Sequence, residues 1–462
     1  MITRIEVDGF KTLSGFSLDL FHGINVLVGP NGSGKTNIIT FFEFVSNLIK
    51  CNNVSEATSR SGGAGVVFKR IGSGTNKEFR SKIYGCIDRA ELPVPFLQQD
   101  KEFKAKPFLF YLYTFEIEFS EGINPIFFKA QSLRLKCCSE FISSSSIDKE
   151  SYNWDLICNT RVSKSYKVNA QVDVLRKSLL ETTLFMYRYG SKKNRRNFFK
   201  DVISSSASVG EPLPKIIERY IPVLRLCKDL SGGEIYNIIP SSIKLPEDSA
   251  RPPRILKDGS GLSATLNALK KGSPIQGGNE DQTHLRTPKA ALHSNTLTEL
   301  LPYYQQANPT ISDIDVVDDT FSNQLRVTFE IENGAYTASV PLALMSDGTL
   351  KWITLITAAF TAKSMFSIEE PENYLHPRMQ SRIVSIMREL LIKNEKNAFT
   401  LMTTHSETLL NKCQPEELII VSLINGSTVA HRNKNPDIIS KEIRETGFGL
   451  GYYYTTGALG DD

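Results

Sequence analysis

The residues best suited to chemistry lie in one glycine-rich segment near the N-terminus, Gly29-Pro30-Asn31-Gly32-Ser33-Gly34-Lys35-Thr36. An apolar run at residues 24–28 precedes it and is typical of a buried strand, and residues 37–50 follow with a helical pattern. Glycines let backbone N–H groups turn inward around an anion, and a helix N-terminus adds a favourable dipole. Strand, glycine-rich loop and helix in this order predict a phosphate-binding P-loop. Lys35 would reach the β- and γ-phosphates of ATP, and Thr36 would hold Mg²⁺.

A second group of candidate residues lies far downstream, where an apolar run at residues 364–368 ends in Glu369-Glu370-Pro371-Glu372. A strand that ends in carboxylates downstream of a P-loop is the Walker B arrangement. One carboxylate would support the Mg²⁺ shell and the next would orient and deprotonate the attacking water. We assign Glu369 to the metal and Glu370 to the general base. A solvated acidic turn is the alternative, and the preceding strand argues against it.

His405 is the third candidate, because it follows another apolar strand at residues 399–403. A histidine at such a strand end can contact the γ-phosphate or polarise the water. A lone histidine is usually structural, but this one comes one strand after the acidic pair. We therefore predict a catalytic role for His405 beside Glu370.

These groups need a scaffold in which strands and helices alternate, so the sequence predicts an α/β fold. We expect an N-terminal lobe with the P-loop at residues 1–135 and a C-terminal lobe at residues 301–462. Residues 136–300 between them are expected to be an inserted arm or partner region, mostly helical. The sequence shows no sustained heptad pattern, so we do not expect a long coiled coil.

Bulk properties narrow the function classes. The chain has 462 residues and a net charge of +4, which is too small to require a nucleic-acid partner. The sequence shows no apolar stretch of membrane-spanning length, and its charged N-terminal residues do not resemble a signal peptide. Seven scattered cysteines without a C-x-x-C pair argue against a disulfide framework or a zinc site. We expect a cytoplasmic protein with no membrane contact.

Four segments together resemble a known class, the ATP-binding-cassette (ABC) type ATPases of the SMC/RecF/OLD group. They are GFKTLSGFSLDLFHGINVLVGPNGSGKTNII, LMSDGTLKWITLI, SIEEPENYLHP and LMTTHSETLL, in the order of the family. The resemblance covers the start of the chain and roughly its last third. It implies a P-loop NTPase fold of the ABC-type ATPase head, a mixed sheet with helices and an inserted helical and β arm region.

The resemblance also implies roles for individual residues. Ser346 and Gly348 fall on the family's signature motif, which contacts ATP bound to the opposite subunit, so a homodimer or higher oligomer with composite sites is implied. Residues 373–376 fall on the D-loop, and His405 falls on the switch histidine. Glu369 stands where most relatives carry Asp, although Glu also occurs in the OLD-like branch.

Some assignments stay open at this stage. Leu230-Ser231-Gly232-Gly233-Glu234 resembles the transporter signature more closely than residues 345–349 do, but it lies too far upstream, and we interpret it as a tight turn. Gln98, Gln99 and Gln131 are equal candidates for the glutamine that links metal to lid. Lys11 is either a phosphate contact or a solvated lysine.

The partner is also open. The basic run at residues 192–200 with its two phenylalanines is either a nucleic-acid contact or a charged helix end. OLD nucleases append a TOPRIM domain, and the 37 residues from Gly426 to Asp462 are too few for one. We expect a sensor or scaffold that controls a separate effector protein, a nuclease or toxin, in bacterial antiphage defence. The alternative is a RecF- or SMC-like DNA-binding ATPase of repair or recombination.

Overall fold

The computed structural model describes residues 1–71, 74–75, 77–89, 92, 105–120, 126–141, 154–163, 165–175, 192–206, 208–272, 296–319, 321–334, 336–362, 365–394 and 398–459. Contacts divide the chain into two compact units. The first unit comprises Met1–Phe21, Pro30–Gly233 and Val421–His431, and the second comprises His22–Gly29, Glu234–Ile420 and Arg432–Asp462. The chain therefore passes between the units at the start of the P-loop.

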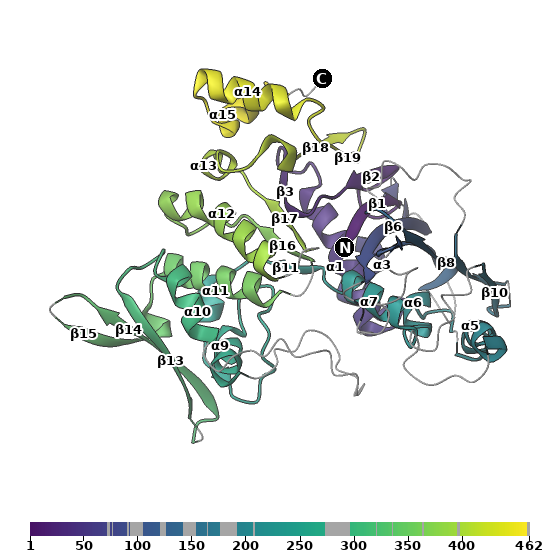
Figure 1. Ribbon diagram of the computed structural model, residues 1–462, viewed down its shortest axis with the longest axis horizontal. Helices are drawn as coiled ribbons and strands as arrows, with labels where there is room; N and C mark the ends of the chain where they lie inside the picture. The colour runs from purple at the N-terminus through teal and green to yellow at the C-terminus, as the bar shows by residue number, and fades with distance from the viewer. Residues whose placement is uncertain are drawn as a thin grey trace. The chain divides into compact units, whose positions relative to one another are not determined.

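The first unit contains an antiparallel sheet in the order β10-β9-β8-β7-β6-β1-β2 (Figure 1). Its strands are β1 (Ile2–Asp8), β2 (Phe16–Asp19), β6 (Glu78–Asp88), β7 (Phe108–Phe119), β8 (Ile126–Cys138), β9 (Leu156–Val162) and β10 (Val168–Val174). The unit also holds α1 (Lys35–Cys51), α2 (Val54–Arg60), α3 (Ala64–Val67), β4 (Arg70–Ile71), β5 (Gly74–Thr75), α5 (Lys192–Ser206), α6 (Leu213–Ile216), α7 (Ile221–Leu230) and β19 (Ser427–His431).

Aromatic side chains join α1 to one face of this sheet. Phe44 of α1 packs on Phe79 of β6 with ring centroids 5.4 Å apart, and Phe79 packs on Phe115 of β7 at 5.7 Å. Phe10 packs edge-on against Phe41 of α1 at 5.5 Å. All five rings are almost completely buried, so they supply much of the apolar area that holds α1 and its P-loop on the sheet.

The other face of the sheet carries a smaller apolar cluster around Phe110 and Trp154 and, beside it, a row of polar residues. Lys82, Thr114, Ser132, Asn159 and Gln171 are register partners on successive strands and form one row across it. None of the five is buried.

The second unit contains a parallel sheet in the order β11-β16-β17-β3-β18. Its strands are β3 (Gly23–Val28), β11 (Glu234–Tyr236), β16 (Met365–Glu369), β17 (Phe399–Thr403) and β18 (Leu418–Ile424), the last of which runs on into the first unit. All five residues of β17 are buried, including two threonines, so its sequence does not alternate between buried and solvent-facing positions. Parallel pairing places the carboxyl ends of β16, β17 and β3 at one edge.

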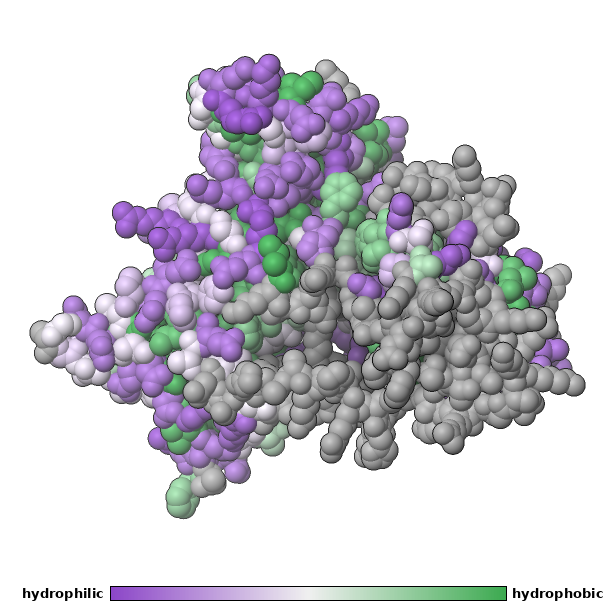
Figure 2. Space-filling model, viewed as in Figure 1, coloured by the Kyte–Doolittle hydropathy of each residue, from purple (hydrophilic) through white to green (hydrophobic). Residues whose placement is uncertain are grey.

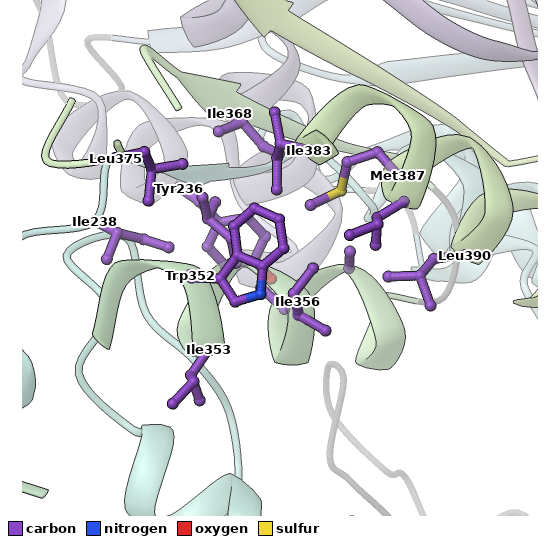
Figure 3. Packing of buried hydrophobic residues seen from close by; sticks show 14 of the residues in the cluster. Tyr236, Ile238, Trp352, Ile353, Ile356, Ile368, Leu375, Ile383, Met387 and Leu390 are labelled. Carbon is purple, nitrogen blue, oxygen red and sulfur yellow. The ribbon is translucent and has the colours of Figure 1, made fainter. Parts of the chain in front are cut away.

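Helices α11 (Asp347–Thr361) and α12 (Pro377–Asn394) carry the core of this unit. Trp352 of α11 lies at its centre, fully buried among side chains of β11, β16, α11 and α12 (Figure 3). Its indole Nε1 donates to the Tyr303 carbonyl at 2.8 Å, which satisfies the ring's one polar atom. The end of α11 that carries Ser346 is thereby anchored in a packed core.

A smaller antiparallel sheet completes the second unit, with β14 (Gln324–Glu332) between β12 (Glu247–Asp248) and β13 (Ile311–Asp319), and with β15 (Thr337–Pro341) also paired to β14. The remaining elements are α8 (Pro240–Ile243), α9 (Leu262–Lys271), α10 (Thr296–Tyr304), η6 (Leu342–Leu344), α13 (Glu407–Leu410), η7 (Pro415–Glu417), α14 (Pro436–Thr446) and α15 (Leu450–Thr455). The visible surface of α14 is mostly hydrophilic (Figure 2). Among the described residues, no helix has both the length and the apolar character needed to cross a membrane.

The two compact units differ from the predicted domains, whose limits lie at residues 135 and 300. Each unit combines stretches that are separated in the sequence. Residues 156–174, expected within a mostly helical insert, form β9 and β10. β9 pairs with Ala130–Leu135 of β8, and β10 pairs in turn with β9. No motif in the sequence marks this pairing, because long-range contacts decide which strands are neighbours in a sheet.

Candidate nucleotide site

The P-loop follows β3 directly, and α1 begins at Lys35 with Gly34 as its N-cap. Gly34 has a φ of 102° and Gly32 a φ of 81°, a region that side chains disfavour, so glycine is required at both positions. No side chain caps α1, and its first turn contains no acidic residue. The N-terminal amide donors and positive dipole of a 17-residue helix are therefore directed at the loop, where they suit an anion.

A series of hydrogen bonds connects the P-loop to two threonines that lie outside it. Asn37 Nδ2 donates to Thr12 Oγ1 at 2.7 Å, Thr12 Oγ1 lies 2.6 Å from Thr428 Oγ1, and Thr428 Oγ1 lies 3.1 Å from the carbonyl of Ser33. Since Asn37 can only donate and the Ser33 carbonyl can only accept, the two hydroxyls donate in the same direction along the chain. Thr428 is 1% exposed, and a Cβ on Gly34 would lie 1.9 Å from its Oγ1. Sequence analysis missed Thr428, because nothing near it in the sequence marks a contact across 395 residues.

Two polar side chains inside the loop suit a phosphate ligand. Lys35 is 8% exposed, and its Nζ donates to the Pro30 carbonyl at 2.9 Å, so the ammonium lies over the loop. Ser33 Oγ is buried and has no hydrogen-bond partner among the described residues. A water molecule or a phosphate oxygen at the loop would satisfy this hydroxyl. Together with the uncapped helix, these residues fit the triphosphate of ATP. Thr36, the predicted Mg²⁺ ligand in the first turn of α1, is exposed.

Lys11 belongs to the wall of a hollow in the first unit. The hollow has a volume of about 340 Å³ and is lined by Lys11, Thr12, Gly65, Val66, Phe68 and Lys69, among others. Lys11 has a left-handed φ of 46°, and its Nζ donates to Thr40 Oγ1 of α1 at 3.0 Å. The half-buried Lys11 side chain is thus bonded to α1. Thr12 connects the hollow to the hydrogen bonds behind the P-loop.

The acidic turn lies at the carboxyl edge of the parallel sheet. Glu369 is abreast of Thr403 on β17, and Thr403 is abreast of Leu27 on β3, one residue before β3 ends. Glu370 follows with a φ of 44°, and its N–H is 3.1 Å from the Thr403 carbonyl. Its exposed carboxylate accepts from Asn373 Nδ2 at 2.8 Å. A carboxylate held at a strand end in this way is suited to act on a water molecule.

His405 lies at the same edge, two residues beyond Thr403. The carboxylate of Glu372 accepts from the His405 N–H at 2.8 Å and from Thr404 Oγ1 at 2.9 Å. His405 itself is exposed. Glu372 thereby ties the segment after β17 to the acidic turn, a role that the sequence did not reveal.

The predicted signature residues lie at the start of α11. Ser346 is its N-cap, and Ser346 Oγ accepts from the Thr349 N–H at 3.3 Å. A Cβ on Gly348 would lie 2.8 Å from the carbonyl of Tyr374, so glycine here permits close packing against the turn after β16. Ser346 is exposed, as a contact with a ligand of another subunit would require.

The competing motif at residues 230–234 packs against α1 within the first unit. The Ser231 carbonyl accepts from Ser46 Oγ at 2.7 Å, and a Cβ on Gly233 would lie 2.3 Å from the carbonyl of Phe42. Close packing therefore accounts for Gly233 without a nucleotide. The turn connects α7 to β11.

Gln131 is occupied by the fold. Its Oε1 accepts from Tyr113 Oη and from the Leu213 N–H, both at 2.7 Å, and its Nε2 donates to the Glu211 carbonyl at 2.9 Å. These bonds leave the buried amide committed to joining β8 to α6. Gln98 and Gln99, the other candidates for the linking glutamine, lie outside the described residues.

Two protein families match the chain. Residues 1–205 match a family described as AAA ATPase domain. Residues 192–411 match one described as AAA domain, putative AbiEii toxin, Type IV TA system. The two matches together cover both the P-loop and the acidic turn.

Curated relatives agree with these families. The chain is 46% identical over 44 residues to the chromosome partition protein Smc of Methanocaldococcus jannaschii, and 25% identical over 195 residues to that of Bacillus subtilis. The chain is therefore similar to AAA ATPases at both of its halves and to Smc proteins over shorter segments. The matched segments are 10% and 42% of this chain, but only 4% and 15% of the two Smc proteins.

Solved structures with a similar arrangement include an Smc head bound to the C-winged helix domain of ScpA. The alignment covers 95% of this ATPase and 99% of that chain, with 12% identity and a TM-score of 0.46. For the SMC head domain from Thermotoga maritima the coverage is 93% and 98%, with 10% identity and a TM-score of 0.37.

Proposed function

We propose that this ATPase binds ATP with Mg²⁺, dimerises around it, and hydrolyses it slowly to control a separate effector protein. The observation that carries the proposal is the uncapped N-terminus of α1 behind a P-loop that Thr428 and Thr12 hold in place. This arrangement suits a phosphate chain and leaves little for the loop to reorganise when one binds.

Each predicted residue has a role in this reaction. ATP supplies the phosphoryl group, and Mg²⁺ spreads the charge of its oxygens. Lys35 and the amides of α1 bind the triphosphate, while Thr36 and Glu369 hold the metal. Glu370 takes a proton from the attacking water, with its carboxylate oriented by Asn373.

His405 acts beside Glu370 in the proposal, as a hydrogen-bonding group for the water or the γ-phosphate. Its backbone N–H is held by Glu372, which belongs to the same turn as Glu370, and its side chain is exposed. The roles of the two residues are therefore linked through one loop.

The dimer follows from Ser346 and Gly348, which would face the nucleotide of a second copy. Ser346→Arg should preserve ATP binding by the single chain and abolish turnover. Mixing Ser346→Arg with Lys35→Ala should restore one working site per heterodimer. An inert mixture of two folded, associating variants would show that the sites are not shared. Ser231→Arg is the matched control and should leave turnover near the wild-type rate.

The biological role that we propose is antiphage defence in the bacterial cytoplasm, with the effector as a nuclease or toxin. The match to a family described by a putative AbiEii toxin and a type IV toxin–antitoxin system supports a role of this kind. The test is a plaque assay with the gene and its neighbours. Lys35→Ala and Glu370→Gln should each lose protection, and this protein alone should give none. Protection by this protein alone would contradict control of a separate effector.

A RecF- or SMC-like role on DNA is the second candidate, and the two Smc relatives favour it. Such a protein should bind DNA with no protein partner, and the affinity should fall steeply with salt, because phosphate contacts release counterions. Filter binding at several salt concentrations separates the two candidates.

A further inference from the structure

One lysine of the second unit is buried beside the acidic turn. Lys351 of α11 is 1% exposed, and its Nζ donates to the carbonyl of Glu370 at 3.0 Å. The same ammonium lies 5.7 Å from the ring centroid of Tyr374, at the other end of the turn. The two carboxylates that act on this charge are those of Glu372 and Glu370.

The turn needs outside support. Glu370 and Tyr374 have φ values of 44° and 66°, in the left-handed region that residues with a side chain disfavour. The Glu370 N–H is held by Thr403, and its carbonyl accepts from the Asn373 N–H at 3.2 Å as well as from Lys351. Lys351 is thus the donor that connects the turn to α11.

Packing alone does not account for a lysine at this position. Burial of the ammonium is unfavourable, and it lowers the pKa of Lys351 to about 8, against the opposing effect of the two carboxylates. An apolar side chain would fill the same volume without that cost. What only a long cationic side chain supplies is a strong hydrogen bond to the Glu370 carbonyl.

A second contact joins the same two elements. Gly348, in the first turn of α11, lies so close to the Tyr374 carbonyl that a Cβ would approach it to 2.8 Å. The first two turns of α11 therefore touch both ends of the acidic turn, Gly348 at Tyr374 and Lys351 at Glu370. Movement of Ser346 at the start of α11 would be passed directly to the backbone of Glu370.

We propose that Lys351 is a positioning residue that ties α11, and with it Ser346, to the turn that presents Glu370. The inference rests on the proposed function in that Glu370 is the base. It adds a physical connection within one chain between Ser346, which is proposed to contact the nucleotide of the neighbouring copy, and Glu370, which is proposed to activate water. In this proposal Lys351 itself contacts neither the nucleotide nor the attacking water.

The test compares Lys351→Met, which keeps the volume and loses the donor, with Lys351→Arg, which keeps the charge. Lys412→Met, at an exposed lysine of the same unit, is the control. The first readout is hydrogen exchange of residues 370–375 in nucleotide-free protein. We expect faster exchange in Lys351→Met, confined to this segment, and near wild-type exchange in Lys351→Arg and Lys412→Met.

The second readout is the split between kcat and KM. Misplacement of the base should lower kcat of Lys351→Met about 100-fold with little change in KM for ATP, and Lys351→Arg should recover most of it. Unchanged exchange or unchanged kcat in a folded Lys351→Met would overturn the inference, and Lys351→Gln serves if Lys351→Met does not fold. A wild-type protein with no ATP turnover would instead refute the proposed function, and the exchange experiment would still decide the role of Lys351.

Discussion

The P-loop of the first unit and the acidic turn of the second both use left-handed backbone, but with different residues. In the P-loop these positions are glycines, Gly32 at φ 81° and Gly34 at φ 102°. In the acidic turn they are Glu370 at φ 44° and Tyr374 at φ 66°. Glycine adopts this conformation freely, whereas Glu and Tyr must be held in it.

The difference indicates how each region is stabilised. The P-loop conformation is compatible with its own residues, and Thr428 with Thr12 adds hydrogen bonds behind it. The acidic turn depends on donors from elsewhere in its unit, including Lys351 of α11. We therefore expect P-loop variants to affect binding most and variants around the turn to affect catalysis most.

The largest effect should come from Lys35→Ala in the P-loop. Backbone donors alone do not neutralise the β- and γ-phosphates, so we expect ATP affinity to fall by about 100-fold or more. Titration with a fluorescent ATP analogue measures this, with Lys412→Ala as the control at an exposed lysine. Wild-type affinity in Lys35→Ala would remove the P-loop from the binding site.

Glu370→Gln should give the opposite pattern, with retained binding and lost turnover. The amide keeps the shape and the hydrogen bond to Asn373 but cannot accept a proton, so kcat should fall by roughly 10² to 10⁴-fold. Phosphate release and nucleotide titration are measured on the same samples, beside the exposed control Glu416→Gln. Equal hydrolysis by Glu370→Gln and wild type would show that another group is the base.

Thr428→Val should have an intermediate effect, on stability first. Valine has the same shape but leaves the Ser33 carbonyl and Thr12 without their shared hydroxyl, which should cost about 1–3 kcal/mol of unfolding free energy. Thr428→Ser keeps the hydroxyl and should lose much less. Urea unfolding of both variants measures the difference, and equal stability would mean that the hydrogen-bond chain adds little.

The smallest effect should be a pH dependence that traces to Lys351. Its pKa is lowered from 10.5 to about 8 by burial, against the effect of Glu372 and Glu370. At pH values between these two pKa values, Lys351 binds a proton more often in the unfolded chain than in the folded protein. The stability of wild type relative to Lys351→Met should therefore rise with pH. The slope should reach at most about 1.4 kcal/mol per pH unit between pH 8 and 10.5. Urea unfolding of both proteins across pH 7–10 checks this, and a constant difference would contradict it.

The elements that carry the candidate site were predictable from local pattern. The strand before the P-loop, the helix after it, and the strands before Glu369 and His405 are confirmed as β3, α1, β16 and β17. Each strand is a mostly apolar run that leads into the candidate residues, and the helix is a helical repeat that begins at Lys35. Neighbouring residues alone specify such elements, so one stretch of sequence suffices.

The side-by-side order of strands β16, β17 and β3 in the second unit could be expected only from the class that the chain resembles. Register between Glu369, Thr403 and Leu27 depends on three strands far apart in the chain. The strands β9 and β10 were missed for the same reason, since an edge strand is defined by the neighbour that it pairs with. Strand partners are a matter of long-range contact, which local periodicity does not encode.

The sequence by itself determined the chemistry that is available: a glycine loop with Lys35 and Thr36, a carboxylate pair after a strand, and a histidine after the next. Tertiary structure alone decided which other residues hold these groups, namely Thr428 behind the loop, Lys351 beneath Glu370, and Gln131 between β8 and α6. The physical reason is that a catalytic motif is a property of neighbouring residues. A buried hydrogen bond depends instead on where two distant side chains meet, and that is settled only when the core around them packs.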